Sequence, residues 1–262
     1  MQQSNLSVIK IGGNIIDNPE ASKNFLEEFS RLEGKKILVH GGGKVATQIA
    51  SRLGIQAQLV DGRRITDKPM LEIVTMVYGG LVNKTLVATL QSLGINAIGL
   101  TGADAGIIEA VKRPVKTIDY GYVGDIKAVN GQTLASLLNN GLIPVIAPLT
   151  YSSAGDLLNT NADTMASATA VALSGVFKVS LIYCFEKDGV LSDPEDDSSV
   201  IPELDPPIYE RYKETGAINK GMIPKLDNSF DALRAGVERV VICHAKDLEK
   251  AAGGEKGTQI RL

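Results

Sequence analysis

Short apolar runs alternate with longer amphipathic stretches along the chain. The apolar runs are rich in Val and Ile, which is typical of buried strands. We expect strands at residues 7–11, 37–39, 95–100, 142–146, 179–183 and 239–242. The longer stretches between them repeat their apolar residues with the helical period, and they predict helices at residues 21–31, 45–53, 68–93, 133–139, 162–173 and 223–235.

This alternation is typical of an α/β protein with an open, mainly parallel sheet in an α/β/α sandwich. We expect two lobes, residues 1–175 and 176–262. Residues 102–131 break into short alternating pieces with turn residues between them, which predicts hairpins forming a lip over a site. The acidic, proline-containing segment 193–207 is expected to be a surface loop.

Composition and charge exclude several classes of function. A net charge of −3 argues against a nucleic-acid partner, whose phosphates require basic patches. The two histidines, His40 and His244, lie in no recognisable hydrolase motif, and Cys184 and Cys243 lack the spacing of a zinc site or a disulfide framework. No apolar run approaches the roughly 20 residues of a membrane span. We therefore expect a cytoplasmic protein with no membrane partner.

Two glycine turns follow predicted strands. Gly12 and Gly13 come directly after the first strand, where Lys10 adds a positive charge. Gly41, Gly42 and Gly43 follow the second strand and open a helix, whose first amides attract anions. The second turn predicts an anion site, although it is not a Walker loop because the sequence lacks GxxxxGK[ST].

Further polar residues lie at predicted helix starts. One predicted helix has three short polar side chains at its start: Asn159 and Asn161 precede it, and Asp163 lies in its first turn. Helix capping explains only one of the three. Lys225 lies in the first turn of another helix, beside Pro224. Arg64 offers a planar fork that suits a carboxylate.

One competing hypothesis remains open at this point. Gly41, Gly43 and Ala46 also fit the loose dinucleotide fingerprint, and Asp61 lies at the distance expected for a ribose contact. A dinucleotide-dependent oxidoreductase is therefore an alternative, but it leaves the lysines and the Asn/Asp cluster unexplained.

Taken together, these pieces resemble the amino-acid kinase family along nearly the whole chain. The motifs that carry the resemblance are IKIGG at 9–13, VHGGG at 39–43, VDGRRIT at 60–66, VNK at 82–84, NTNAD at 159–163 and GMIPK at 221–225. The resemblance implies phosphorylation of the γ-carboxylate of an N-acyl-L-glutamate by ATP with Mg²⁺, in arginine biosynthesis. A carboxylate nucleophile is ionised at neutral pH and needs no general base.

The resemblance also implies a role for each matching position. Lys10 and Lys225 would stabilise the transferring phosphoryl group, and Asp163 would orient both lysines. The N-terminal lobe would hold acylglutamate through Gly41, Gly42, Gly43, Arg64 and Asn159. The C-terminal lobe would hold the nucleotide, with contacts from Lys10, Gly12, Gly13, Glu186, Lys187, Gly189 and Lys225. A homodimer is the expected assembly.

Departures from the family pattern keep some alternatives open. Lys44 replaces the usual proline, which raises the possibility of a succinyl acyl group, and Lys112 and Arg113 on the lip are alternative causes. Residues 185–188, Phe-Glu-Lys-Asp, stand where relatives usually carry Ser-Asp-Val before Gly-Val-Leu. Few residues precede the first strand and the stretch after Gly236 is short, so arginine feedback is not expected. A catalytically silent, ligand-sensing member of the same fold is a third possibility.

Overall fold

The computed structural model describes residues 3–60, 62–218 and 221–262 of the 262-residue chain. In these ranges an eight-stranded sheet has the order β12-β14-β13-β11-β1-β2-β8-β5. Its strands are β1 (Asn5–Ile11), β2 (Lys35–His40), β5 (Ala97–Leu100), β8 (Ile143–Ile146), β11 (Lys178–Phe185), β12 (Glu203–Leu204), β13 (Arg239–His244) and β14 (Thr258–Ile260). Neighbouring strands are parallel, except that β13 and β14 are antiparallel. The predicted mainly parallel sheet is thus confirmed.

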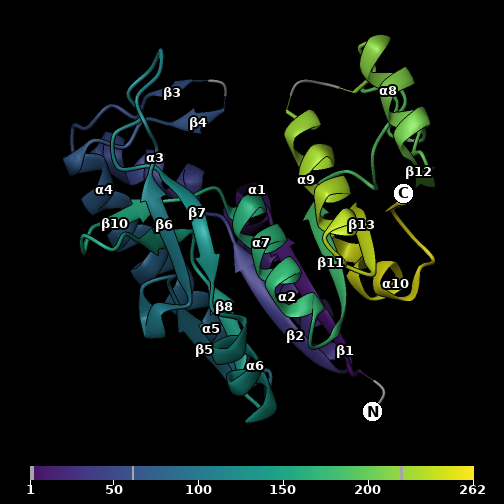
Figure 1. The fold of residues 1–262 in the computed structure, drawn as a ribbon, viewed down its shortest axis with the longest axis horizontal. Helices are drawn as coiled ribbons and strands as arrows, with labels where there is room; N and C mark the ends of the chain where they lie inside the picture. The colour runs from purple at the N-terminus through teal and green to yellow at the C-terminus, as the bar shows by residue number, and fades with distance from the viewer. Residues whose placement is uncertain (1–2, 61, 219–220) are drawn as a thin grey trace.

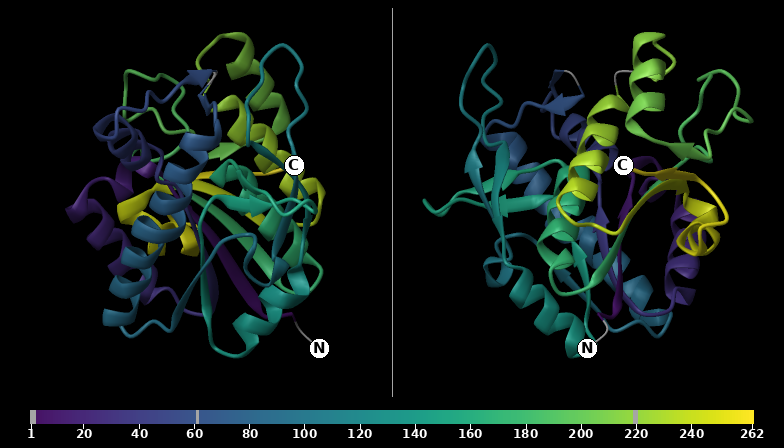
Figure 2. Two further views of the ribbon diagram at one scale, coloured as in Figure 1. Left: turned by 90° about the vertical axis from the view of Figure 1, so that its left-hand side faces the viewer. Right: turned by 45° about the vertical axis from the view of Figure 1, so that its right-hand side comes forward.

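Two smaller sheets lie on one side of the molecule (Figure 1). One has the order β10-β9-β6-β7 and comprises β10 (Leu157–Asn159), β9 (Leu149–Tyr151), β6 (Ile108–Lys112) and β7 (Gly124–Val129). The other pairs β3 (Leu59–Val60) with β4 (Arg63–Arg64). The antiparallel β6–β7 pair confirms the predicted hairpin, and its connecting loop projects beside β3 and β4 (Figure 2).

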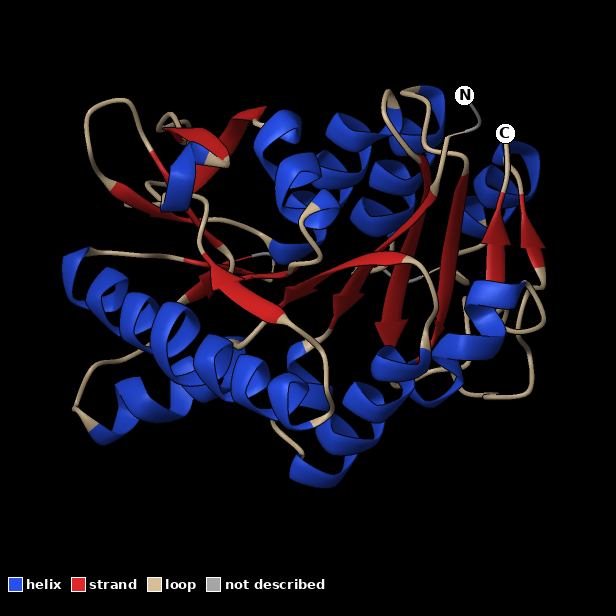
Figure 3. Ribbon diagram, turned by 90° about the horizontal axis from the view of Figure 1, so that it is seen from below, coloured by secondary structure: helices blue, strands red, loops and turns tan. Residues whose placement is uncertain are grey.

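Helices cover both faces of the main sheet (Figure 3). One face packs against α6 (Gly131–Asn139), α7 (Ala162–Ser174), α8 (Pro206–Glu214) and α9 (Ile223–Arg234). The other packs against α1 (Gly13–Ile16), α2 (Pro19–Arg31), α3 (Gly43–Arg52), α4 (Lys68–Val74), the π-helix η1 (Thr75–Val82), α5 (Asn83–Ser92) and α10 (Leu248–Gly253). Two short 3₁₀ turns, η2 (Asp104–Gly106) and η3 (Ala245–Asp247), complete the described elements. The α/β/α sandwich is confirmed.

The two hydrophobic clusters divide the side chains of β1 by strand alternation. Leu6 and Val8 belong to the cluster that includes α7, whereas Ile9 and Ile11 belong to the cluster that includes α2. Since successive side chains of a strand point to opposite faces, Lys10 shares the face of Val8 and points toward α7. The alternation of this buried strand therefore positions its single lysine.

The predicted strands and helices all occur, with shifted ends and one change of helix type. The predicted helix at residues 68–93 consists of α4, η1 and α5 in one continuous run. Asp67 caps its start by accepting from the Met70 amide at 2.9 Å, and Gly94 follows its end with a φ of 78°. By length and composition this run is a candidate membrane span. Buried residues such as Ile73 and Leu90 instead pack it into the core.

Other expectations need adjustment. Segment 193–207 is not wholly a loop, because it contains β12 and the start of α8. Cys184 and Cys243 are fully buried on neighbouring strands with their sulfurs 3.9 Å apart. The lobe boundary at residue 175 stays a prediction, since the main sheet continues from β1 directly to β11.

Candidate active site

Loops that follow three adjacent parallel strands meet at one edge of the main sheet. Gly12 and Gly13 follow β1, the Gly41–43 turn follows β2, and Glu186 follows β11. Their backbones are tied together, because the Gly12 amide donates to the Cys184 carbonyl at 3.3 Å and the Gly41 amide donates to the Ile11 carbonyl at 3.2 Å. Carboxyl ends of parallel strands are where ligands bind in open α/β sheets.

Beside this edge, one carboxylate joins two lysines from separate parts of the chain. Lys10 Nζ of β1 lies 2.7 Å from Asp163 Oδ1, and Lys225 Nζ of α9 lies 3.5 Å from Asp163 Oδ2. Asp163 is in the first turn of α7, whose N-cap Asn161 accepts from the Thr164 amide at 3.0 Å. The structure thus brings together the three residues expected to be catalytic.

The electrostatic state of this cluster follows from its burial. The Asp163 side chain is only 11% exposed, and burial alone would raise its pKa. The charges of Lys10 and Lys225 together outweigh burial, so the net pKa of Asp163 is lowered. The carboxylate therefore stays ionised at neutral pH. Both ammonium groups also lie over the Phe185 ring, with Nζ to centroid distances of 5.0 Å for Lys10 and 4.8 Å for Lys225.

Close packing makes glycine necessary in the second turn. Gly42 has a φ of 150°, and a Cβ placed there would lie 3.0 Å from Tyr78 Cδ1. A Cβ at Gly41 would lie 3.2 Å from the Gly13 amide nitrogen. The two glycine turns are therefore in contact, and their bare backbones form the wall of a cavity.

His40 braces the Gly41–43 turn from inside the core. Its side chain is fully buried, with Nδ1 2.6 Å from the Gly41 carbonyl oxygen and Nε2 3.1 Å from Asn83 Nδ2. Burial lowers the pKa of His40 to about 4, so the ring is neutral at pH 7. A neutral ring that donates from Nδ1 and accepts at Nε2 satisfies both contacts. Asn83 also donates to the Val145 carbonyl at 2.9 Å, which anchors this brace to β8.

Two adjoining cavities share the Gly41–43 turn, Leu59 and Arg64. The first, here called the lysine cavity, has a volume of about 480 Å³ and is lined in addition by Lys10, Gly12, Gly13, Asn14, Ile15, Lys44, Thr47, Phe185, Glu186 and Lys225. Glu186 is held there by Asn14, whose Nδ2 donates to Oε2 at 2.7 Å. This cavity carries positive charge beside bare backbone, which suits phosphate groups.

The second, here called the arginine cavity, has a volume of about 240 Å³. Its other lining residues are Gly62, Arg63, Tyr78, Arg113, Val123, Pro148, Asn159, Thr160, Asn161, Ala162 and Thr164. Arg64 bridges to α3, where its Nη2 donates to the Gly43 carbonyl and to Thr47 Oγ1, both at 2.8 Å. Asn159 donates to Thr66 Oγ1 at 3.0 Å. These contacts hold two of the expected substrate-binding side chains at the wall.

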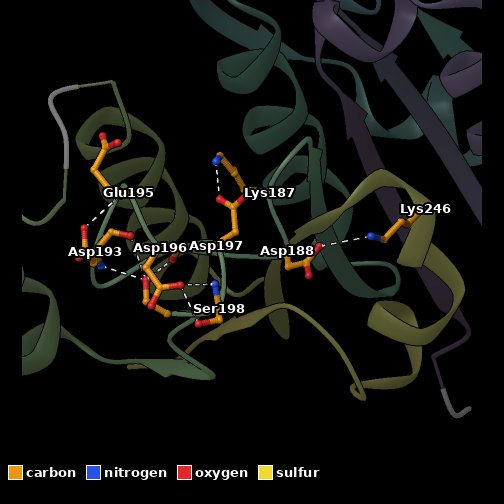
Figure 4. A network of polar contacts seen from close by, with 9 residues as sticks. Lys187, Asp188, Asp193, Glu195, Asp196, Asp197, Ser198 and Lys246 are labelled. Atoms are coloured by element: carbon orange, nitrogen blue, oxygen red, sulfur yellow. Dashed lines mark hydrogen bonds and ion pairs between the residues drawn. The ribbon is translucent and has the colours of Figure 1, made fainter.

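Two of the expected nucleotide contacts lie away from both cavities. Lys187 pairs with Asp197, as Figure 4 shows, and its side chain is half exposed. Gly189 is a packing residue, because a Cβ there would lie 2.6 Å from Thr258 Oγ1. The roles of these two residues stay predictions. Asp61, the residue on which the dinucleotide alternative depended, lies outside the described residues.

The sequence did not point to several residues that the cavities contain. Phe185 contacts both lysines, and Tyr78 packs on Gly42 from the π-helix η1. Arg63 places one more guanidinium group in the arginine cavity, beside Arg113, which the sequence offered as a cause of acyl-group choice. Of these residues, Phe185 could have been noticed in the sequence, because it belongs to a segment that departs from the family pattern.

Comparisons with known proteins agree with this geometry. Residues 5–244 match the model of the amino acid kinase family. A protein from Cytophaga hutchinsonii named acetylglutamate kinase is 60% identical over 98% of both chains, and one of the same name from Bacteroides thetaiotaomicron is 54% identical over 98% of both.

Solved structures show the same fold. A Streptococcus mutans protein, 28% identical, superposes with a TM-score of 0.77 over 97% of this chain and 98% of its own. Carbamate kinase from Giardia lamblia is 13% identical and superposes with a TM-score of 0.74 over 99% of both chains, which is evidence of fold alone. The match to the family model and the close relatives establish that the chain belongs to the amino acid kinase family.

Proposed function

We propose that this chain transfers the γ-phosphoryl group of ATP to the γ-carboxylate of an N-acyl-L-glutamate, in arginine biosynthesis. Family membership and relatives at 53–60% identity named acetylglutamate kinase make the chain a phosphotransferase that uses a carboxyl group as acceptor. The observation that carries the finer proposal is the ion-paired cluster of Lys10, Asp163 and Lys225 beside the lysine cavity.

The reaction itself needs no proton transfer. A γ-carboxylate oxygen of the acylglutamate attacks the γ-phosphorus of ATP, and the bond from that phosphorus to the β,γ-bridging oxygen breaks. The products are an acyl phosphate and ADP. Since the nucleophile is already an anion, the difficulty is to bring it against a second anion while charge spreads over the transferring oxygens.

Lys10 and Lys225 address this electrostatic difficulty. They contact different oxygens of Asp163, whose single negative charge holds both ammonium groups without neutralising the pair completely. At an effective dielectric constant near 20, one charge pair about 4 Å apart interacts by roughly 4 kcal/mol. The amides of the two glycine turns add fixed dipoles without side-chain bulk.

The residues present are compatible with Mg²⁺ that arrives with the nucleotide. Among the described residues there is no group of three or more His, Cys, Asp or Glu side chains that would hold a metal without a substrate. Protein Mg²⁺ sites often use only one or two carboxylates together with substrate phosphates. Glu186 lines the lysine cavity and offers one such carboxylate. The ion would neutralise part of the phosphate charge when bound.

The division of ligands between the two cavities completes the proposal. ATP phosphates occupy the lysine cavity, between Gly12, Gly13 and Lys225. The acylglutamate occupies the arginine cavity, with its α-carboxylate at Arg64 and its amide near Asn159. The Gly41–43 turn lines both cavities, so it lies where the two substrates meet. The C-terminal lobe would supply the remaining nucleotide contacts.

Two alternatives from the sequence lose support, and two expectations stay open. The dinucleotide-dependent oxidoreductase conflicts with membership of a kinase family, and the silent sensing module does not account for the retained lysine and aspartate cluster. The homodimer and the cytoplasmic location stay predictions.

A coupled assay of ADP release tests the proposal. The purified protein should release ADP only when ATP, Mg²⁺ and an N-acylglutamate are all present, and free glutamate should not replace the acylated substrate. The control is a sample without acceptor, which measures basal ATP hydrolysis. Tight NADH binding with no acylglutamate-dependent ADP release would overturn the proposal.

A further inference from the structure

The arginine cavity has more guanidinium groups than an N-acetylglutamate requires. Arg63, Arg64 and Arg113 all line it, and no Asp or Glu is found among its described lining residues. In the proposed function the γ-carboxylate of the substrate faces the lysine cavity. Only the α-carboxylate is then left for the arginines, and Arg64 is placed to take it.

Arg113 is held firmly but has a donor without a partner. Its Nε and Nη2 donate to Asp125 Oδ1 at 3.0 and 2.5 Å, which fixes the plane of the guanidinium. The remaining Nη1 is buried and has no hydrogen-bond partner among the described residues. An unpaired buried donor of a charged group is costly, so a small rotation of the side chain, which is 20% exposed, that brings Nη1 to a ligand acceptor would be favourable.

The backbone ties Arg113 to the wall of the cavity that contains Val123 and Asn159. Its amide donates to the Val123 carbonyl at 2.8 Å, and Val123 in turn pairs with Asn159 in a parallel bridge. Arg63 and Arg113 also line a neighbouring cavity of about 490 Å³, together with Pro114, Lys116, Thr117, Ile118, Tyr120 and Asp125. An acyl chain that passes Asn159 and Val123 therefore finds both space and a guanidinium.

We infer that the acyl group of the substrate ends in a carboxylate, as a succinyl group does, and that the Arg113 guanidinium, whose side chain lines both cavities, pairs with this carboxylate. The inference rests on the proposed function and specifies its substrate class. Asp125 holds the guanidinium from the other edge, which is the usual arrangement for a positioned arginine. A neutral acetyl group would leave both the neighbouring cavity and Nη1 unused.

Lys44, the residue from which the sequence raised a succinyl group, does not serve this purpose. It lines the lysine cavity and not the arginine cavity. Its charge instead acts on Asp17. Burial raises the pKa of Asp17, and the positive charge of Lys44 partly offsets that rise. We therefore assign the choice of acyl group to Arg113 in the β6–β7 hairpin and not to Lys44 at the start of α3.

The test compares kcat/KM for N-succinyl- and N-acetyl-L-glutamate in the wild type, Arg113→Gln and Arg113→Lys. Hydrogen bonds to charged groups typically change binding by about 10- to 100-fold. We expect the wild type to prefer the succinyl substrate by about 10-fold or more, Arg113→Gln to lose that preference, and Arg113→Lys to restore part of it. Calorimetry of both acylglutamates with the wild-type protein gives the same comparison without a variant.

A matched control comes from the same hairpin. Lys127 Nζ pairs with Glu109 Oε1 at 2.9 Å and lines none of the three cavities, so Lys127→Gln should keep the wild-type preference. A wild-type preference for acetyl, or a succinyl preference that Arg113→Gln leaves unchanged, would overturn the inference alone. Absence of ADP release with either acylglutamate would overturn the proposed function as well.

Discussion

Replacing Lys225 by alanine removes one of the two positive charges from the proposed transfer site. Lys225 suits this test better than Lys10 because Asp163 keeps an ion pair with Lys10 at 2.7 Å after the change. The Lys225 side chain is 25% exposed, whereas that of Lys10 is 9% exposed, so its loss disturbs the core less. We expect the variant to fold normally.

The expected loss of rate follows from the charge geometry. A unit charge about 4 Å from the transferring oxygens is worth roughly 4 kcal/mol at an effective dielectric constant near 20. Part of this interaction already exists with the bound nucleotide, so only the share that grows in the transition state changes kcat. We therefore expect kcat to fall by about 10²- to 10³-fold, with a much smaller change in the KM of either substrate.

Steady-state kinetics with both substrates varied would measure this separation. Lys23→Ala is the matched control, because its side chain is 73% exposed on α2 and pairs with Glu27 only at 4.0 Å. That variant should behave as the wild type. A Lys225→Ala enzyme with near-wild-type kcat would refute the two-lysine argument, and equal rises in both KM values with kcat unchanged would assign Lys225 to binding alone.

Four further predictions concern binding, stability, assembly and inhibition. Arg64→Ala should raise the KM for acylglutamate by about 10- to 100-fold with a smaller change in kcat, and steady-state kinetics that show the reverse pattern would contradict its assignment. Because the pKa of His40 falls from 6.5 to about 4 on burial, its neutral form stabilises the fold above pH 6.5, and this contribution is lost as the pH falls toward 4. Over that interval the free energy of unfolding in urea should fall by about 3 kcal/mol more for the wild type than for His40→Gln. Equal losses in the two proteins would refute a stabilising role of the neutral His40 ring. Light scattering should give a homodimer, and arginine at millimolar concentration should not inhibit; a hexamer or sigmoidal inhibition would contradict these expectations.

Much of the fold was predictable because its strands are buried on both faces. A run such as residues 179–183 is mostly apolar on both faces of the strand, so it is assigned as a buried strand without ambiguity. The observed strand β11 extends it by only a few residues at its ends. The π-helix η1 was not predictable. It lies inside a continuous apolar run, and the Gly79–Gly80 pair within that run does not by itself specify the wider turn. The short strand β12 and the helix α8 were hidden by the acidic residues around them.

The candidate site was predictable to the extent that its residues lie at the ends of strands and helices. Lys10 and Lys225 flank recognisable turns, so their motifs could be read directly. The ion pair of Arg113 with Asp125 depends instead on the register of the β6–β7 hairpin, where Val111 pairs with Asp125 beyond a register shift between Glu109 and Ala110. Register of this kind comes from tertiary packing, which a local sequence pattern does not contain.

Trapping of the reaction product tests the central claim most directly. An acyl phosphate reacts with hydroxylamine to give a hydroxamate, so the enzyme should form one hydroxamate for each ADP released from ATP, Mg²⁺ and an N-acylglutamate. Asp163→Asn should lose both products together, since the lysines would no longer be held beside the cavity. ADP release without hydroxamate would show that water, not the carboxylate, accepts the phosphoryl group, and that result would contradict the account.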